Sequence, residues 1–187
     1  MRSLVYFVAT SADGYIAEPD GRFDRFPVQG DHIDALIAEF PEMLPGSART
    51  ALRIDGAGRF DTVLEGRATH QVGLDAGIAD AYPHLRHLVF SSTLDAVDPA
   101  VELVRDDPLA LVRDLKRADG ADIWLCGGGR LAATLLPEID EIVLKVNPVL
   151  FGEGIPLLGG TRPVDLELIG VRPFEPGVVW QSYRIRR

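Results

Sequence analysis

The sequence predicts an α/β fold with a central mixed sheet, mostly parallel and flanked by helices, that ends in a C-terminal antiparallel hairpin. Short apolar runs with strand character alternate with runs of helical periodicity along most of the chain, a pattern typical of parallel strands joined by helices. The last two strand candidates, 164–172 and 178–186, follow each other without a helix, which predicts the antiparallel pair. With 187 residues, the chain is expected to form one domain over residues 1–187.

The N-terminal third begins with a strand and continues through a loop into helices. Residues 3–9 are apolar and run into an Asp-Gly turn, which predicts a buried first strand rather than a signal peptide. Residues 18–30 are rich in Gly, Pro and Asp and are expected to form a loop. Helical spacing predicts a helix over 31–40, and a second short helix is expected over 48–54. The buried face of the first helix is expected to hold Ile33, Leu36, Ile37 and Phe40.

Three further strands and one helix follow from local patterns. Residues 61–65, before Gly66, and 85–90, before the serines, are each expected to form a short strand, and 141–147 alternates with strand period. Asp107 followed by Pro108 predicts a helix start, because a carboxylate caps free N–H groups and proline suits the first helical position. The buried stripe of that helix is expected to hold Leu111, Val112 and Leu115.

A run of three glycines, Gly127–Gly129, is the most informative feature of the chain. It joins a predicted strand, 122–126, to a predicted helix, 129–136, which Pro137 ends. Glycines allow the backbone to approach a bulky anion, and the free N–H groups at a helix start attract phosphate. The alternative is a tight turn with no ligand. The pattern is not the Gly-x-Gly-x-x-Gly fingerprint of N-terminal dinucleotide-binding domains.

Two segments upstream also follow predicted strands and carry groups that can bind phosphate. Gly66-Arg67-Ala68-Thr69 offers a guanidinium and a hydroxyl, and Ser91-Ser92-Thr93 offers three hydroxyls. Each segment alone is also compatible with capping or turn formation. Ligands of α/β sheets bind beyond the carboxyl ends of strands, where all three segments are expected to lie.

Composition and charge exclude several classes of partner. The net charge of −9 disfavours nucleic acid and anionic membrane surfaces, since both require a basic surface. No apolar run approaches the about 20 residues needed to span a bilayer. Cys126 is the only cysteine, so no internal disulfide can form, and a cytoplasmic protein is expected.

No metal site is expected from the sequence. His84 and His87 lie three residues apart, but no third ligand is apparent. His70 could contact a ligand near Thr69, although a surface position is the favoured interpretation. Cys126 is interpreted as a small core residue.

Three motifs together resemble the reductase domain of the riboflavin-biosynthesis bifunctional protein (the RibD C-terminal domain) and its stand-alone relatives. The opening strand and Ser11–Ala17 resemble the first motif of that family, and Asp122–Leu131 resembles its glycine motif. Glu138–Leu157 resembles its late strand and loop. The resemblance covers essentially the whole chain, with 18–60 the least similar part, and it implies the dihydrofolate reductase-like fold.

The resemblance implies an NADPH site and assigns residues to it. Arg67 and hydroxyl groups near the adenosine ribose suit a 2′-phosphate, whereas a carboxylate would repel it. Ala9 and Ile16 match positions whose backbone flanks the nicotinamide. Ser91 and Ser92 match positions near the ribose and its 2′-phosphate. The other implied cofactor-binding residues, which would hold phosphates or complete the glycine motif, are Gly66, Arg67, Thr69, Gly127, Gly128, Gly129, Arg130 and Leu131.

The chain departs from the family at positions that would recognise substrate. Riboflavin enzymes usually carry a lysine or arginine where Tyr15 stands, together with a Ser-Gly-Glu-Ser-like segment that this chain lacks. Folate reductases carry a Pro-Trp pair after the first strand, which is also missing. The expected substrate is therefore a small pyrimidine- or pterin-like heterocycle or a carbonyl compound, without a choice among pathways.

Two acidic residues are candidates for the substrate side. Asp13 is the candidate catalytic acid, because hydride transfer to a C=N or C=O group needs a proton. Its alternative is a purely structural role in the Asp-Gly turn. Glu153 is a candidate substrate contact, and its alternative is an exposed loop acid.

The leading hypothesis is an NADPH-dependent reductase of a small heterocyclic or carbonyl substrate that acts as a homodimer. A homodimer is expected because relatives are commonly dimers and the C-terminal strands are apolar. One alternative is a non-catalytic NADP(H)-binding sensor or scaffold that has kept the cofactor loops. A third reading is an α/β domain without any nucleotide.

Overall fold

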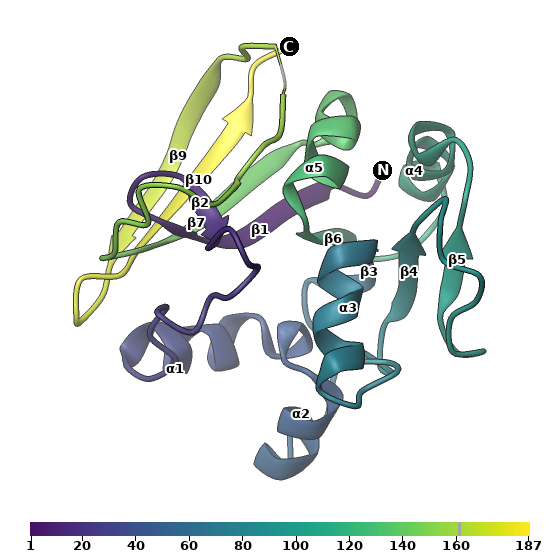
Figure 1. Ribbon diagram of the computed structural model, residues 1–187, viewed down its shortest axis with the longest axis horizontal. Coiled ribbons are helices and arrows are strands. Elements are labelled where there is room, and N and C mark those ends of the chain that lie inside the picture. The colour runs from purple at the N-terminus through teal and green to yellow at the C-terminus, as the bar shows by residue number, and fades with distance from the viewer. Residues whose placement is uncertain (161) are drawn as a thin grey trace.

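The protein has a continuous eight-stranded sheet with strand order β5-β4-β3-β6-β1-β7-β10-β9 (Figure 1). This computed structural model describes residues 1–160 and 162–187. The pairs from β5 to β7 are all parallel, and β10 pairs antiparallel with both β7 and β9. The predicted mixed sheet with a C-terminal hairpin is therefore confirmed. The strands of this sheet are β1 (Leu4–Ser11), β3 (Phe60–Gly66), β4 (Arg86–Phe90), β5 (Glu102–Val104), β6 (Asp122–Gly127), β7 (Glu141–Asn147), β9 (Leu166–Pro173) and β10 (Val179–Ile185).

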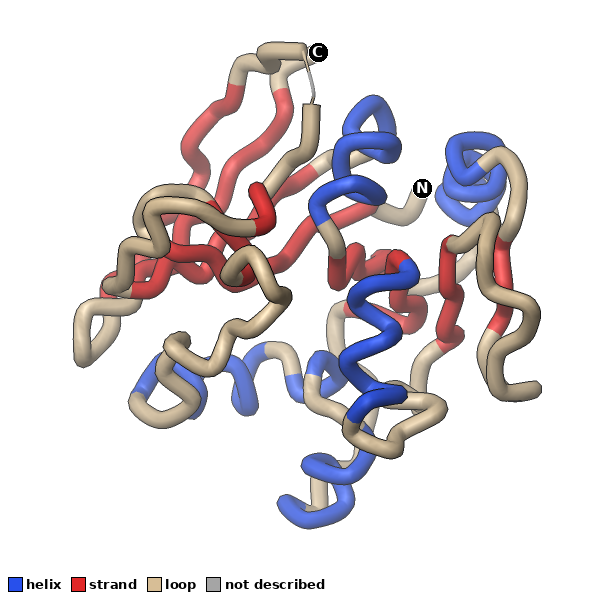
Figure 2. Tube along the Cα trace, viewed as in Figure 1, coloured by secondary structure: helices blue, strands red, loops and turns tan. Residues whose placement is uncertain are grey.

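Helices and short turns cover the sheet and connect its strands (Figure 2). A separate two-stranded ribbon pairs β2 (Tyr15–Ala17) with β8 (Ile155–Pro156). None of the helices in the described residues has the length and apolar character needed to cross a bilayer. The helices are α1 (Asp31–Glu39), α2 (Gly46–Leu52), α3 (Arg67–Asp75), α4 (Pro108–Arg117) and α5 (Gly129–Leu135), with 3-10 turns η1 (Pro41–Met43) and η2 (Leu136–Glu138).

The alternation of side chains along the central strands builds two apolar cores, one on each face of the sheet. On β1, Leu4 and Tyr6 belong to the core under α4 and α5, while Val5 and Phe7 belong to the core that includes Ala35 of α1. Successive strand residues point to opposite faces, so the apolar run Leu4–Ala9 of β1 requires cover on both sides.

The helix predicted over 31–40 is present as α1, but its buried face differs from the prediction. His32 and Ala35 are its buried residues, and Ile33 and Ile37 are only half-buried. The His32 ring packs edge-on at 6.4 Å from Phe174, which precedes β10, so a distant segment selects the buried face. The expected contribution of Leu36 and Phe40 is confirmed, since both pack against this core.

Element boundaries differ most where the structure is locally irregular. The short strands β2, β5 and β8 were not expected, because two or three residues are too few to show a period. Helix α2 ends at Leu52, two residues before the predicted end, because Arg53 adopts a left-handed backbone with φ of 54°. Pro137 lies within η2, immediately after α5.

The predicted start of α4 is confirmed in detail. Asp107 is the N-cap residue, and its Oδ1 accepts a hydrogen bond from the Ala110 N–H at 3.0 Å. Val112 and Leu115 are buried in the core, and Leu111 packs against it. A local capping signal and helical spacing were sufficient to define this helix.

Candidate functional site

The candidate site lies at the carboxyl edge of the parallel strands, as the sequence predicted. Glu65 at the end of β3 is in register with Gly127 at the end of β6, and Gly66 is in register with Phe90 at the end of β4. The segments that follow these strands therefore leave the sheet at one edge, which is where α/β folds bind ligands.

The glycine loop and the start of α3 are in close contact. A Cβ atom at Gly127 would lie 3.2 Å from Thr69 Oγ1, and one at Gly128 would lie 3.4 Å from the same atom. A Cβ at Gly66 would lie 3.4 Å from the backbone nitrogen of Gly128. The peptide bond between Gly127 and Gly128 is cis. The structure thus brings Gly66, Thr69 and the glycine loop together, with half-buried backbone at Gly128 beside the Thr69 hydroxyl.

Gly129 has a packing role that the sequence did not indicate. A Cβ atom there would overlap the carbonyl oxygen of Pro156 and lie 3.1 Å from that of Leu157. The Gly159 N–H also donates to the Gly129 carbonyl at 3.3 Å, and the Leu157 N–H donates to Gly14 at 3.0 Å. Gly129 therefore allows the segment after β8 to lie against the start of α5.

The arginine of the upstream segment reaches the hydroxyl segment. Arg67 Nη1 donates a hydrogen bond to Thr93 Oγ1 at 2.7 Å, and the hydroxyls of Ser91 and Thr93 lie 3.4 Å apart. Within the described part of the chain, Arg67 makes no ion pair with a carboxylate. Ser92 is exposed beside them. A guanidinium held by hydroxyls and free of carboxylates is suited to a phosphate.

The remaining residues implied to bind the cofactor differ in their burial and in whether a side chain or only backbone could contact a ligand. Ile16 lies at the loop, with its Cδ1 3.8 Å from a Cβ placed on Gly128, and Ala9 is half-buried on β1. Arg130 is exposed at the start of α5. The Leu131 side chain is buried in the core, so only its backbone could reach a ligand.

The Asp13 carboxylate anchors a loop, which favours the structural alternative over proton donation. It accepts hydrogen bonds from Ser11 Oγ at 2.6 Å and from the Gly152 N–H at 2.7 Å, and it also accepts from the Phe151 N–H. The Ser11 hydroxyl is the main cause of a lowered pKa for Asp13, and the two backbone groups add to it. A carboxyl group with a lowered pKa is ionised at neutral pH and has no proton to donate.

Glu153 lies on the same loop and is exposed. Nothing in the described residues forms a hydrogen bond or ion pair with its carboxylate. The loop itself is held by Asp13 and by Phe151, whose ring stacks on Phe26 with centroids 5.3 Å apart. This stacking connects the 18–30 loop to the substrate side of the expected site.

Lys145 is a candidate that the sequence analysis did not identify. It is half-buried on β7, in register with Ala9 of β1 and Trp180 of β10, so the three side chains share one face of the sheet. Burial lowers the pKa of the Lys145 ammonium. The sequence feature that could have identified Lys145 is a lysine within the alternating strand 141–147. The structure places it beside Ala9, a residue implied to flank the nicotinamide.

Comparison with known proteins agrees with this architecture. Residues 2–180 match the RibD C-terminal domain family. The uncharacterized protein YwjB of Bacillus subtilis (strain 168) is 29% identical over 184 residues, which cover 95% of each chain. A second uncharacterized protein of that strain, YyaP, is 38% identical over 98 residues, 51% of this chain and 52% of YyaP.

Solved structures show the same fold. A Shewanella sp. PV-4 protein assigned provisionally to riboflavin biosynthesis has a TM-score of 0.72 at 25% identity, with both chains fully covered. A Thermotoga maritima diaminohydroxyphosphoribosylaminopyrimidine deaminase/5-amino-6-(5-phosphoribosylamino)uracil reductase has a TM-score of 0.68 at 16% identity, covering 99% of this chain and 57% of that one. Dihydrofolate reductase from Enterococcus faecalis, complexed with NADP(H), has a TM-score of 0.68 at 15% identity, covering 99% and 97%. The dihydrofolate reductase-like fold is confirmed.

Replacement of Gly129 by alanine tests the packing of the loop. The added Cβ would overlap the Pro156 carbonyl, so we expect the free energy of unfolding to fall by about 1–3 kcal/mol or more. Gly159→Ala is the matched control, because among residues 1–160 and 162–187 the nearest atom to a Cβ there is Arg130 Cγ at 4.0 Å. Denaturant unfolding measures both variants. Equal stability of Gly129→Ala and the control would contradict the close approach.

Proposed function

The chain belongs to the RibD C-terminal domain family, and from this premise we propose that it is an NADPH-dependent reductase of a small heterocyclic or carbonyl substrate. The observation that carries the proposal is the meeting of Arg67, Thr93 and the glycine loop at one edge of the sheet. Membership of this family suggests enzyme activity of the reductase type.

The cofactor end of the proposed site combines backbone and cationic groups. The half-buried backbone of Gly128, next to the Thr69 hydroxyl, suits a pyrophosphate, because glycine has no side chain to block its approach. Arg67 and Ser91 suit the 2′-phosphate that distinguishes NADPH from NADH. The net charge of −9 gives no general attraction for anions, so these local groups must supply it.

The substrate side is proposed to lie on the face of the sheet that Ala9 and Lys145 share. When bound, NADPH would supply a hydride from C4 of its nicotinamide. Ile16 and Ala9 would hold that ring, and the 18–30 loop, tied to Phe151 by stacking, would exclude water. Tyr15, whose side chain lies beside Gly154, and the neighbouring Glu153 are proposed to contact substrate.

Lys145 is proposed as the proton donor in place of Asp13. An ammonium on a half-buried strand position can deliver a proton to the nitrogen or oxygen that gains electron density when hydride arrives. Its lowered pKa makes it a stronger acid than an exposed lysine. Asp13 then acts as a positioning residue that holds the Phe151–Gly152 backbone.

The second candidate function is a non-catalytic NADP(H)-binding sensor or scaffold. It is favoured by the departures from family substrate motifs, Tyr15 above all, and it requires only the cofactor end of the site. Oxidation of NADPH in the presence of pterin, pyrimidine, flavin or quinone acceptors separates the two functions, because a sensor would bind NADPH without turnover. We propose that the reductase is cytoplasmic and acts on a small molecule, without nucleic-acid or membrane partners.

A homodimer is proposed from the edge strand β9. Its apolar side chains are exposed, with Leu168 at 55% and Val171 at 56%, and one side of the strand has no partner strand in the sheet. Long apolar edge strands promote association, and a second copy of the chain is the simplest cover.

Arginine 67 should control the choice between NADPH and NADH. Arg67→Ala removes a charge-assisted contact to the 2′-phosphate worth about 1.5–3 kcal/mol, so NADPH affinity should fall about 10- to 100-fold. NADH affinity should barely change. Arg113→Ala, an exposed arginine on α4, is the control. Calorimetric titration measures all three proteins, and equal losses for both cofactors would remove the proposed role in binding the 2′-phosphate.

Lys145 should cause the fall of kcat at alkaline pH, the alkaline limb of the pH profile. A proton donor must be protonated, so the rate is full below the pKa of Lys145 and is lost as the pH rises through that pKa. Because burial lowers the pKa of Lys145, this loss begins at a lower pH than it would for an exposed lysine. Lys145→Met should reduce kcat by about 10²- to 10⁴-fold and abolish this limb. Asp13→Asn should keep the limb. An unchanged pH profile of kcat in Lys145→Met would refute the assignment.

Association through β9 should depend on its exposed apolar residues. Leu168→Glu places a charge in the proposed interface and should yield a monomer by light scattering coupled to size exclusion. Leu52→Glu, which alters a residue 52% exposed on α2, should leave the dimer intact. A wild-type protein that elutes as a monomer at high micromolar concentration would show that the dimer proposal is wrong.

A further inference from the structure

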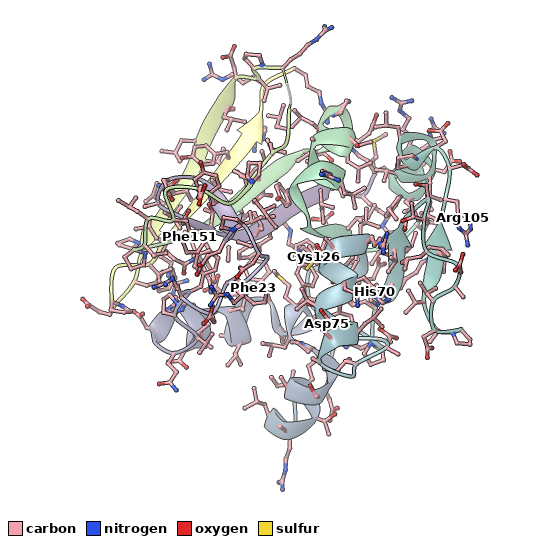
Figure 3. The ribbon with its side chains drawn as sticks, viewed as in Figure 1. Phe23, His70, Asp75, Arg105, Cys126 and Phe151 are labelled. Atoms are coloured by element: carbon pink, nitrogen blue, oxygen red, sulfur yellow. The ribbon has the colours of Figure 1, made fainter. Side chains whose placement is uncertain are left out.

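A buried group of metal-binding side chains lies outside the proposed cofactor site. Glu65 at the end of β3, His70 on α3 and His87 on β4 are 4%, 4% and 1% exposed. One ligand atom from each lies within 4.8 Å of the others. Figure 3 labels His70 on α3, with Cys126 at the end of β6. The expectation that His70 lies on the surface is therefore wrong, because α3 turns this ring toward the sheet.

The distances in this group resemble those between ligands of one metal ion. Glu65 Oε2 lies 3.1 Å from His87 Nε2 and 3.7 Å from His70 Nδ1. Bonds from zinc to nitrogen or oxygen are about 2.0 to 2.2 Å, so neighbouring ligand atoms of a tetrahedral site lie about 3.3 to 3.6 Å apart. The two distances fall on either side of this range, and small side-chain rotations would bring them into it.

A second carboxylate orients His87 as in many histidine–metal sites. His87 Nδ1 lies 2.8 Å from Asp80 Oδ1 and its Nε2 faces Glu65, so a neutral ring that donates its one proton to Asp80 keeps a lone pair on Nε2. In a neutral ring, that Nε2 lone pair would face a carboxylate oxygen at 3.1 Å, which is repulsive. A cation is therefore required between His87 and Glu65, either a proton on Nε2 or a metal ion. Metal-bound histidines usually donate their other N–H to a carboxylate in this way.

The His70 ring provides an independent indication of a ligand. Its Nε2 is buried and has no hydrogen-bond partner among the described residues, and its Nδ1 is 3.7 Å from Glu65, which is too long for a hydrogen bond. A buried ring without a hydrogen bond is costly unless another group binds it. A metal ion on Glu65 would engage the His70 ring through Nδ1, the nitrogen that faces this carboxylate, whereas a proton between His87 and Glu65 would leave both His70 nitrogens without a bond.

We propose that Glu65, His70 and His87 bind one divalent transition-metal ion, of which Zn²⁺ best suits two imidazoles and a carboxylate. The ion would join β3, α3 and β4. Because Glu65 precedes Gly66 and His70 follows Thr69, it would brace the segment between them. Cys126 is not counted as a ligand, since its sulfur is not part of the group whose ligand atoms lie within 4.8 Å of one another. Glu65, His70 and His87 are not among the residues proposed to contact the cofactor, so metal binding can be measured without reference to reductase activity.

The test is metal binding by the whole chain after treatment with a chelator. Wild type should bind one equivalent of Zn²⁺, and Co²⁺ should give the visible absorption of a tetrahedral site. Its melting temperature should rise with Zn²⁺ concentration. His70→Gln and His87→Gln should no longer bind one equivalent of Zn²⁺ and should not show the visible absorption of Co²⁺ in a tetrahedral site. Asp80→Asn should weaken binding about 10- to 100-fold by loosening the orientation of His87.

The controls separate this site from accidental histidine binding and from a protonated cluster. His84→Gln removes an exposed histidine outside the group and should still bind one equivalent. The proposal would be overturned if the wild-type protein bound neither Zn²⁺ nor Co²⁺. It would also be overturned if His84→Gln failed to bind the metal and His87→Gln still bound it. A nuclear magnetic resonance spectrum of the metal-treated protein in which His87 remains a doubly protonated imidazolium would also overturn it, because a proton would then be the cation between His87 and Glu65.

Discussion

The candidate site depends on the close approach of backbone segments that only glycine permits. The end of β3, the loop after β6 and the segment after β8 come from distant parts of the sequence and meet at Gly66, Gly127–Gly129 and Pro156. A side chain at Gly129 would overlap the Pro156 carbonyl, and one at Gly127 would crowd the Thr69 hydroxyl, with 3.2 Å between the Cβ and Oγ1. Parallel strands bring their carboxyl ends to one edge, and the glycines let the segments that follow them pack there.

Local charge gives that edge its chemical character against an acidic background. Arg67 is held by the Thr93 hydroxyl and makes no ion pair within the described residues, so its charge is available to an anion. On the α1 face, Lys145 is the corresponding half-buried cation, and burial alone lowers its pKa. These two cations define the two ends of the proposed reaction site: phosphate recognition at one and proton delivery at the other.

The sequence predicted the features that depend on local patterns. The cap at Asp107, the alternation in β7 and the glycines after β6 each have a mechanism that acts within a few residues. The sequence predicted a mostly parallel sheet with an antiparallel C-terminal pair, but not the order of its strands. The buried face of α1 depends on Phe174, and the contacts of Asp13 with Phe151 and Gly152 span more than a hundred residues, so no local pattern predicts them. Glu65, His70 and His87 come from three elements, which hid their proximity in the sequence.

The central claim is that the glycine loop and Arg67 form an NADPH site. The most direct measurement is a calorimetric titration of the wild-type protein with NADPH and, in parallel, with NADH. The account predicts one equivalent of NADPH per chain, bound at least about tenfold more tightly than NADH, because only NADPH offers Arg67 a 2′-phosphate. Absence of binding by either cofactor, or equal affinity for both, would contradict it.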